Sequence, residues 1–538
     1  MTLQAEMRSE PKPSLRSDLP VAIVGAGPVG LTTATGLAFY GIPFVVFEDD
    51  DRLSVDTKAG TTLSRTLEVF RRYGVADEIL AVALRVDEIG EIDRATGRSH
   101  TPVEMHVLGQ ETRYPFVINL PQQDMEPVLA RTVEASGLGN IRFGHHFAGL
   151  EQFADRVRLQ LATAQGEETF EASYLLACDG GRSAVRETLG IAVEGKSIDE
   201  RYALVDLIVD LDVTNPRDYP YLAYFSDARE WMILVRQPHC WRFLFPLPLD
   251  RAEPTAEELR DKALSFIGEV SNIRVLQKVI YRTHHRVASR WRSGRVFLMG
   301  DAAHLITPMW ALGLNTGVLD ASNLPWRLTW CLRGWADDAL LDGYEREQRP
   351  VALHGSGEMA EAARAAMAKA KGAVTAMTDN TWSNAYTRGM LGVRLDVDGR
   401  GEWSMVKSET EPPLRPGDRI PDALLHTPEG REVRLHDLCS DRFLALYFAD
   451  VRRRPPIPCR SSRALAHFAV SRWDAPLDSG LRDRTLLDPG DRVMRRLAVP
   501  KDTLVLVRPD EHVAAIQPIG PDAAERLYAA VVGMPPPS

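Results

Sequence analysis

The chain has 538 residues, of which 44% are apolar and 26% charged, a composition typical of a soluble globular protein. At about 150 residues per domain, this length predicts two to four domains. The net charge of −10 argues against nucleic acid or an anionic membrane as the main partner. The five cysteines are scattered, without C-x-x-C or zinc spacing. They therefore exclude a disulfide scaffold, predict no metal site and favour a reducing compartment.

The first 18 residues are polar and contain proline, without the apolar core of a signal peptide. No apolar run approaches the roughly 18 residues of a membrane span. We therefore expect a flexible N-terminal arm over residues 1–18 and a cytoplasmic protein.

The first motif is a strand, a glycine loop and a helix near the start of the chain. Residues 21–24 and 44–47 are short apolar runs typical of buried strands, and residues 31–40 predict a helix. The loop has G-x-G-x-x-G spacing, and an acid follows at about 20 residues. Glycine permits the tight turn and a close approach of pyrophosphate, whose charge the helix N-terminus favours. The motif predicts a dinucleotide site at Gly25, Gly27, Gly30 and Glu48.

The pattern changes at residues 202–249, where aromatic and β-branched runs alternate with turn residues. This texture predicts an antiparallel sheet inserted into the nucleotide-binding pattern, which resumes at residues 295–304. A stretch dense in proline and charge at residues 411–422 indicates a boundary. The strands and helices beyond it predict a third, α/β domain.

Two further motifs accompany GAGPVG at residues 25–30: CDGGRSAVR at residues 178–186 and GDAAHLITPMWALGLN at residues 300–315. With all three, the chain resembles the single-component FAD-dependent aromatic hydroxylases, of the p-hydroxybenzoate and phenol hydroxylase kind. The resemblance covers essentially the whole chain. It implies an α/β fold: a Rossmann-like FAD-binding domain, an inserted antiparallel β-sheet substrate domain and a C-terminal thioredoxin-like α/β domain.

The resemblance also implies domain boundaries. These are residues 19–190 and 284–400 for the discontinuous FAD-binding domain with its helical extension, 191–283 with parts of 76–120 for the substrate domain, and 412–538 for the C-terminal domain. No paired thiols stand at active spacing in the last of these, so we expect it to have a structural or dimer-forming role rather than a redox one.

The implied activity is hydroxylation of a phenolic substrate with NAD(P)H and O₂ through a flavin hydroperoxide, by a homodimer. The substrate and the choice between NADH and NADPH stay open. Two alternatives remain: the same fold performing a Baeyer–Villiger-type or substituent-removing oxidation in polyketide tailoring, and a non-catalytic flavin-binding scaffold.

The resemblance distributes the FAD contacts over the three motifs. It puts Glu48 on the ribose and Asp301 on the ribityl chain, and it gives Asp179 a part in both FAD and nicotinamide-cofactor binding. Backbone N–H groups at residues 313–315 open a helix, and they would face the charge of the reduced flavin. The expected contacts are Gly25, Gly27, Gly30, Glu48, Lys58, Gln123, Asp179, Asp301, Pro308, Gly313, Leu314 and Asn315.

Some positions depart from the family pattern. Ala311 replaces a glycine, and its Cβ would resist a positive φ. Trp310 is large for a position beside a flavin face, and it is either a lid over the site or a core anchor. Lys58 stands where the family often has arginine, and it lacks the planar guanidinium fork. Arg65 and Gln123 fit the pattern better.

Catalysis on a phenol needs a group that accepts its proton. Asp56 is the candidate base, with a solvated loop aspartate as the alternative. Arg236 is a candidate partner for a substrate carboxylate, with a sheet-edge arginine as the alternative. Alternation puts it on one face with Met232 and Leu234. The residues eligible to roof the site are Tyr224, Met232, Leu234, Arg236, Phe243 and Phe245.

Overall fold

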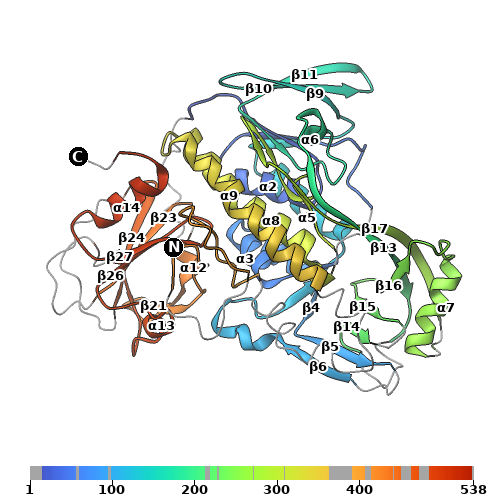
Figure 1. Ribbon diagram of the computed structural model, residues 1–538. Coiled ribbons are helices and arrows are strands. Elements are labelled where there is room, and N and C mark those ends of the chain that lie inside the picture. The colour runs from blue at the N-terminus through green and yellow to red at the C-terminus, as the bar shows by residue number, and fades with distance from the viewer. Residues whose placement is uncertain are drawn as a thin grey trace.

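Three large sheets organise the chain in the computed structural model (Figure 1). The eight-stranded sheet lies on one side of the molecule and the C-terminal sheet, in orange and red, on the other. Helix α8, Leu312–Leu332, runs between them. The residues described are 15–55, 60–94, 99–211, 219–226, 230–268, 270, 272–307, 309–362, 390–405, 414–439, 441–449, 462–471, 481 and 484–535.

The first sheet is mainly parallel and has the strand order β18-β19-β12-β1-β2-β8. Val21 is in register with Phe44 on one side and Tyr174 on the other, and only β18 runs antiparallel. Every residue of β1, β2 and β12 is buried, as the continuous apolar runs predict. The strands are β1 Val21–Val24, β2 Phe44–Phe47, β8 Gly139–Arg142, β12 Tyr174–Ala177, β18 Arg292–Ser293 and β19 Val296–Leu298.

Helices pack on this sheet and support the loops at its edge. Helix α2 follows β1 directly and ends at Gly41, whose φ of 73° is that of a left-handed cap. Helix α8 is buried over almost its whole length and packs along α2. Helix α9 continues into a π-helical turn, Val351–Gly357. The other bounds are α2 Pro28–Tyr40, α3 Ser64–Arg72, α4 Ala76–Val82, α5 Gln122–Ala135, α6 Ala184–Thr188 and α9 Asp342–Pro350.

The second sheet has the order β20-β17-β13-β16-β15-β14-β5-β6 and separates two apolar clusters. One face packs against α7, Ala256–Ile267, and the other faces the N-terminal end of α8. Successive side chains along each strand point to opposite faces of the sheet, so alternate residues join the two clusters. The strands are β5 Glu88–Asp93, β6 Ser99–Glu104, β13 Val193–Ile208, β14 Leu222–Ser226, β15 Met232–Arg236, β16 Trp241–Pro248, β17 Arg274–Ala288 and β20 His304–Leu305.

The third sheet is C-terminal and has the order β22-β21-β25-β24-β23-β26-β27. Strands β23 and β24 are parallel, whereas β26 and β27 pair antiparallel beside β23. Helix α14, Ala523–Val532, follows the last strand. The strands are β21 Leu424–His426, β22 Glu432–Arg434, β23 Phe443–Phe448, β24 Leu465–Ser471, β25 Thr485–Leu487, β26 Thr503–Val507 and β27 Val513–Pro518.

Two small sheets complete the description. One is β11-β10-β9 and the other is β3-β7-β4. Their strands are β3 Thr61–Thr62, β4 Leu84–Val86, β7 Val117–Asn119, β9 His146–Gln152, β10 Val157–Thr163 and β11 Gly166–Ala172. The expected mixed α/β fold is confirmed, and among the described residues no helix is both long and apolar enough to cross a membrane.

Buried ion pairs join the C-terminal sheet to the rest of the chain. The turn between β26 and β27 carries Arg508, whose Nη1 lies 2.9 Å from an oxygen of Glu347 on α9. Arg327 on α8 lies 2.7 Å from the same carboxylate. Burial alone would raise the pKa of Glu347, but the two guanidinium charges outweigh it and lower the pKa to about 2.

The Glu347→Gln substitution should lower the free energy of unfolding at pH 7 by about 3–5 kcal/mol, because it removes the counter-charge of the buried Arg327 and one of the two carboxylates that pair with Arg508. The folded pKa lies below the unfolded value of about 4.3, so this stabilisation is complete above that pH and is lost as the pH falls toward 2. Chemical denaturation at several pH values should therefore find the two proteins converging below about pH 4.5.

Glu358→Gln is the matched control, since its side chain is 63% exposed and pairs with an exposed histidine. We expect it to change stability by less than about 0.5 kcal/mol. A Glu347→Gln protein as stable as this control would contradict the structural role of the buried pairs.

Candidate functional site

The glycine loop after β1 closes tightly against β12 but leaves one side open. Gly25 has φ of 103°, and a Cβ there would lie 2.3 Å from the carbonyl oxygen of Cys178. At Gly30 a Cβ would lie 2.0 Å from the oxygen of Gly25. Gly27, by contrast, has no atom within 4 Å of such a Cβ. Gly25 and Gly30 therefore allow close packing within the protein, whereas Gly27 leaves room beside the N-terminus of α2 for another molecule.

Glu48 lies at the end of β2 next to this opening. Its Oε2 accepts the N–H of Ala26 at 2.5 Å, and its Oε1 accepts the N–H of Asp50 at 3.2 Å. The carboxylate is thus fixed at the edge of the glycine loop, where a ribose of a dinucleotide would offer hydroxyl groups.

The second motif contributes Asp179, directly after β12. Its Oδ2 accepts the N–H of Val185 at 3.1 Å, whereas its Oδ1 is buried and has no partner among the described residues. Burial raises the pKa of Asp179 against the hydrogen bonds that lower it. A buried acceptor without a donor is costly, and a ligand hydroxyl would satisfy it. Arg186 instead links two motifs, since it donates to the carbonyls of Gly181 and Ala302, each at 2.9 Å.

Asp320, on helix α8, fixes the third motif by hydrogen bonds. Its role was not predicted from the sequence. Its Oδ2 accepts the N–H of Gly300 at 2.8 Å and lies 2.8 Å from Nε2 of His304. His304 also stacks on Trp291. Asp301 follows in the same 3₁₀ turn, Gly300–Ala302, and is exposed. The presence of an acidic residue within the otherwise apolar sequence of α8 could have indicated this role.

The loop before α8 has unusual backbone geometry. Trp310 and Ala311 have φ values of 57° and 56°, both left-handed and both without glycine. Helix α8 begins at Leu312, so Gly313 and Leu314 lie in its first turn, where backbone N–H groups lack helical partners. The side chain of Asn315 holds this turn in place. It accepts the N–H of Leu63 at 2.9 Å and donates to the carbonyl of Ala311 at 2.7 Å.

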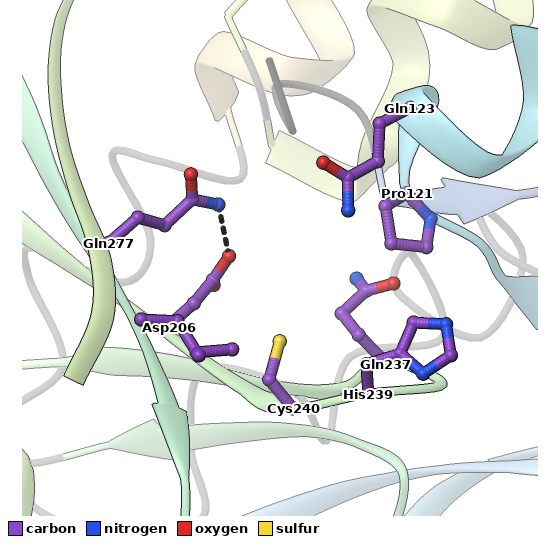
Figure 2. A pocket seen from close by; sticks show the side chains of 8 residues that line it. Pro121, Gln123, Asp206, Gln237, His239, Cys240 and Gln277 are labelled. Atoms are coloured by element: carbon purple, nitrogen blue, oxygen red, sulfur yellow. Dashed lines mark hydrogen bonds between the residues drawn. The ribbon is translucent and has the colours of Figure 1, made fainter. Parts of the chain in front are cut away.

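Three sequence candidates lie outside the described residues: Asp56, Lys58 and Pro308. Gln123 lies at the start of α5 and points into a pocket of about 180 Å³ between this helix and the second sheet (Figure 2). The pocket is also lined by Pro121, Asp206, Gln237, Cys240 and Gln277.

Four of the residues expected to roof the site lie on the opposite face of the second sheet: Met232, Leu234, Phe243 and Phe245. Met232 and Leu234 do share a face, but they pack with Phe243 and Phe245 against α7, away from the loop before α8. Alternation alone cannot tell which face of a strand a helix will cover. Ile233 and Val235 are on the loop side. Tyr224 also lies there, in one cluster with Trp310.

Two of the arginines named in the sequence contact other parts of the protein. Arg236 donates to the carbonyls of Gln237 and Cys240 at 2.5 and 3.1 Å and lies over the ring of Trp241, so it braces the turn between β15 and β16. Arg65 is buried on α3, where its guanidinium contacts Glu68, Glu511 and the carbonyl of Asp510. The contacts of Arg65 involve residues distant in sequence, and those of Arg236 involve a turn. Hydrophobic periodicity predicts neither.

The described donors and acceptors fit an FAD molecule lying from the glycine loop to the start of α8. The adenosine end would have the opening at Gly27 and the carboxylate of Glu48. The unsatisfied Oδ1 of Asp179 and the exposed Asp301 would face the middle of the cofactor, and the first-turn N–H groups of α8 would face its flavin end. Backbone donors at a helix start suit the anionic end of a reduced flavin.

The family described as FAD binding domain matches residues 18–354, more than half of the chain. A Burkholderia cenocepacia (strain HI2424) protein named 3-(3-hydroxy-phenyl)propionate/3-hydroxycinnamic acid hydroxylase is 32% identical over 346 residues, which are 63% of this chain and 62% of that protein. An Escherichia coli (strain K12 / DH10B) protein of the same name is 32% identical over 348 residues, 63% of this chain and 60% of its own. The matches thus span less than two thirds of these relatives.

Solved structures match nearly the whole chain. Aklavinone-11 hydroxylase, in a ternary complex with FAD and aklavinone, is 26% identical with a TM-score of 0.79, covering 96% of this chain and 99% of its own. The flavin-dependent monooxygenase PieE, in complex with FAD and substrate, has a TM-score of 0.81 at 24% identity, covering 97% and 100%. This second likeness bears on the fold alone.

The Gly27→Ala substitution should weaken FAD binding at least about tenfold while leaving the fold intact, because the new Cβ meets no protein atom and extends into the space for the pyrophosphate. The backbone at Gly27, with φ of −70°, accepts alanine without strain. FAD content after purification and titration of the apoprotein measure the effect.

Gly109→Ala is the control, since its Cβ would also meet no atom within 4 Å but it lies away from the loop, in the 3₁₀ turn Met105–Gln110. Unchanged FAD affinity in Gly27→Ala would remove the glycine loop from the FAD site.

Proposed function

Because the chain belongs to the FAD binding domain family, we propose that it is an FAD-dependent monooxygenase that hydroxylates a phenolic aromatic substrate with O₂ and NADH or NADPH. The names of the hydroxylase relatives support the reaction class. The likeness to aklavinone-11 hydroxylase over nearly the whole chain supports the same assignment.

The observation that carries this proposal is the aromatic surface opposite the start of α8. The loop-side face of the second sheet forms one buried cluster with Trp310 and Leu312. Tyr202 packs against Trp231 and Tyr281, with ring centroids 5.6 and 5.9 Å apart. An aromatic substrate suits such a surface, since ring pairs at these distances are favourable.

The chain's own residues would position and protect the reactants. Bound FAD supplies the chemistry of hydride acceptance and oxygen activation. The N–H groups of Gly313 and Leu314 would hold negative charge on the cofactor, and Asn315 fixes that turn through its side chain. The apolar cluster around Trp310 excludes water from the reacting ring.

Asp56 remains our candidate for the base that takes the phenol proton, and Lys58 and Pro308 remain candidate FAD contacts. Arg236 is a weaker candidate for substrate binding, because it already braces a turn. For Trp310 both alternatives stay open, a lid over the ring and a core anchor, and its burial in the loop-side cluster is the observation that favours the anchor.

The C-terminal sheet takes a structural role in this proposal. Its central order β25-β24-β23-β26-β27, with the last two strands antiparallel, supports a thioredoxin-like layout. Redox activity is not part of it, since burial holds the pKa of the Cys439 thiol well above its usual range.

A homodimer and a cytoplasmic location complete the proposal. Sedimentation tests the dimer. The location is supported by the free thiols of Cys178, Cys240, Cys331 and Cys439.

A panel of phenols incubated with the purified yellow holoenzyme and NADH or NADPH tests the function. We expect at least one phenol to accelerate NAD(P)H oxidation and to gain one oxygen atom from ¹⁸O₂ with its substituents retained. Loss of a substituent, or insertion of oxygen beside a carbonyl, would replace hydroxylation by another oxidation on the same fold. No stimulation by any phenol would contradict the proposal.

The Asp56→Asn substitution should lower hydroxylation by about 10²–10⁴-fold, because it removes a proton acceptor, while FAD content stays unchanged. The Asp56→Asn enzyme should regain activity as the pH approaches the phenol's own pKa of about 10, because the substrate then ionises without a base. A turnover and pH profile equal to those of the unaltered enzyme would remove Asp56 from the mechanism.

A further inference from the structure

The pocket beside Gln123 lies on the same face of the second sheet as the aromatic surface. On β13 the side chain of Asp206 follows Tyr202 and Leu204 at intervals of two, and on β17 Gln277 precedes Val279 and Tyr281 in the same way. Residues at this spacing line one face about 7 Å apart. One continuous surface therefore changes from aromatic and aliphatic to polar as it approaches the pocket.

The charge in this polar part is already balanced. Arg242 on β16 donates from Nε and Nη2 to the two oxygens of Asp206, each at 2.9 Å. Gln277 donates to the same carboxylate at 2.6 Å, as Figure 2 shows. The neighbouring Arg236 braces the β15–β16 turn through backbone carbonyls. Among the described residues lining the pocket, no cation is left to receive an anion.

The remaining groups at the pocket are neutral hydrogen-bonding groups. Gln237 is fully buried, and its Oε1 has no partner among the described residues. Its amide and that of Gln123 point into the same space (Figure 2). Burial raises the pKa of the Cys240 thiol to about 12, so it stays uncharged. At the rim, the side chain of His239 is 76% exposed to water, and its Nε2 lies 3.9 Å from Oδ2 of Asp124.

We propose that this pocket binds a neutral hydrogen-bonding substituent of the aromatic substrate, a carboxamide or hydroxyl, and rejects a carboxylate. The proposal rests on the function proposed above and narrows its substrate class. A substituent N–H or O–H satisfies the buried oxygen of Gln237. A carboxylate would lose its hydration without gaining a cation, since Arg242 is already paired with Asp206, and would leave that oxygen unsatisfied. The substrate class would differ in this respect from the phenylpropionate that names the relatives.

Two ligands of nearly the same shape separate charge from size: 3-(3-hydroxyphenyl)propionate and its primary amide. Each is titrated into the oxidised holoenzyme and followed by calorimetry and by the flavin absorbance spectrum. We expect the amide to bind at least about tenfold more tightly, a ratio set by charge. Equal affinity, tighter binding of the carboxylate, or no response to either ligand would overturn the proposal.

Two variants invert the charge balance of the pocket. Gln277→Lys adds a cation at a half-buried position, and Asp206→Asn frees the charge of Arg242. Each should shift the affinity ratio by at least about tenfold toward the carboxylate. Gln277→Lys keeps the buried ion pair, so it preserves the test if Asp206→Asn fails to fold. Asp261→Asn on the exposed side of α7 is the control and should leave the ratio unchanged.

The outcomes distinguish this inference from the function on which it rests. If the phenol panel yields hydroxylated products but the carboxylate is preferred, only the pocket assignment is overturned. If the variants shift the ratio as expected but no phenol is hydroxylated, the pocket assignment stands and the proposed reaction fails. A ratio that Gln277→Lys does not move would overturn the pocket assignment.

Discussion

Buried charge between the C-terminal sheet and the helices of the FAD-binding region is the constraint on which much of the structure depends. The turn between β26 and β27 brings Arg508, Asp510 and Glu511 against α3, α8 and α9. Buried charges are tolerated only with close partners, and removing one partner exposes the full desolvation cost of the other. The residues matched by the FAD family are therefore not an independent unit. Arg65 pairs with Glu511, which lies outside the matched residues, and Glu347, which lies inside them, pairs with Arg508 outside.

Helix α8 transmits this constraint to the site. Its middle carries Asp320, which fixes the turn at Gly300, and its start carries Asn315, which fixes the loop at Leu63. Farther along, Trp326 donates to Asp510 at 3.1 Å. One buried helix thus connects the cofactor motifs with the C-terminal sheet. The same helix start faces a sheet whose surface is aromatic at one end and polar at the other.

The sequence predicted what depends on neighbours in the chain. The glycine loop, its flanking strands and Glu48 are specified within 30 residues, and the structure has them as a strand, a tight turn and a helix. Partners distant in sequence could not be predicted in this way. Periodicity paired Met232 with Leu234 correctly but could not show that α7 covers that face, and nothing near Arg65 indicates Glu511. The pocket combines the start of α5 with strands β13 and β17 and the turn between β15 and β16, and its lining was predicted only at Gln123.

The left-handed pair at Trp310 and Ala311 has a consequence for how this protein would tolerate change. A non-glycine residue in this region costs roughly 1–2 kcal/mol, and here two stand in succession. Glycine usually weakens a protein, but at these two positions it would remove strain. At Ala311 that relief removes only a methyl group, so selection for thermal stability alone would favour glycine there. At Trp310 glycine would also remove a ring that is 3% exposed, a loss of about 3–5 kcal/mol that outweighs the strain. The loop should therefore accept glycine at one of its two left-handed positions and not at the other.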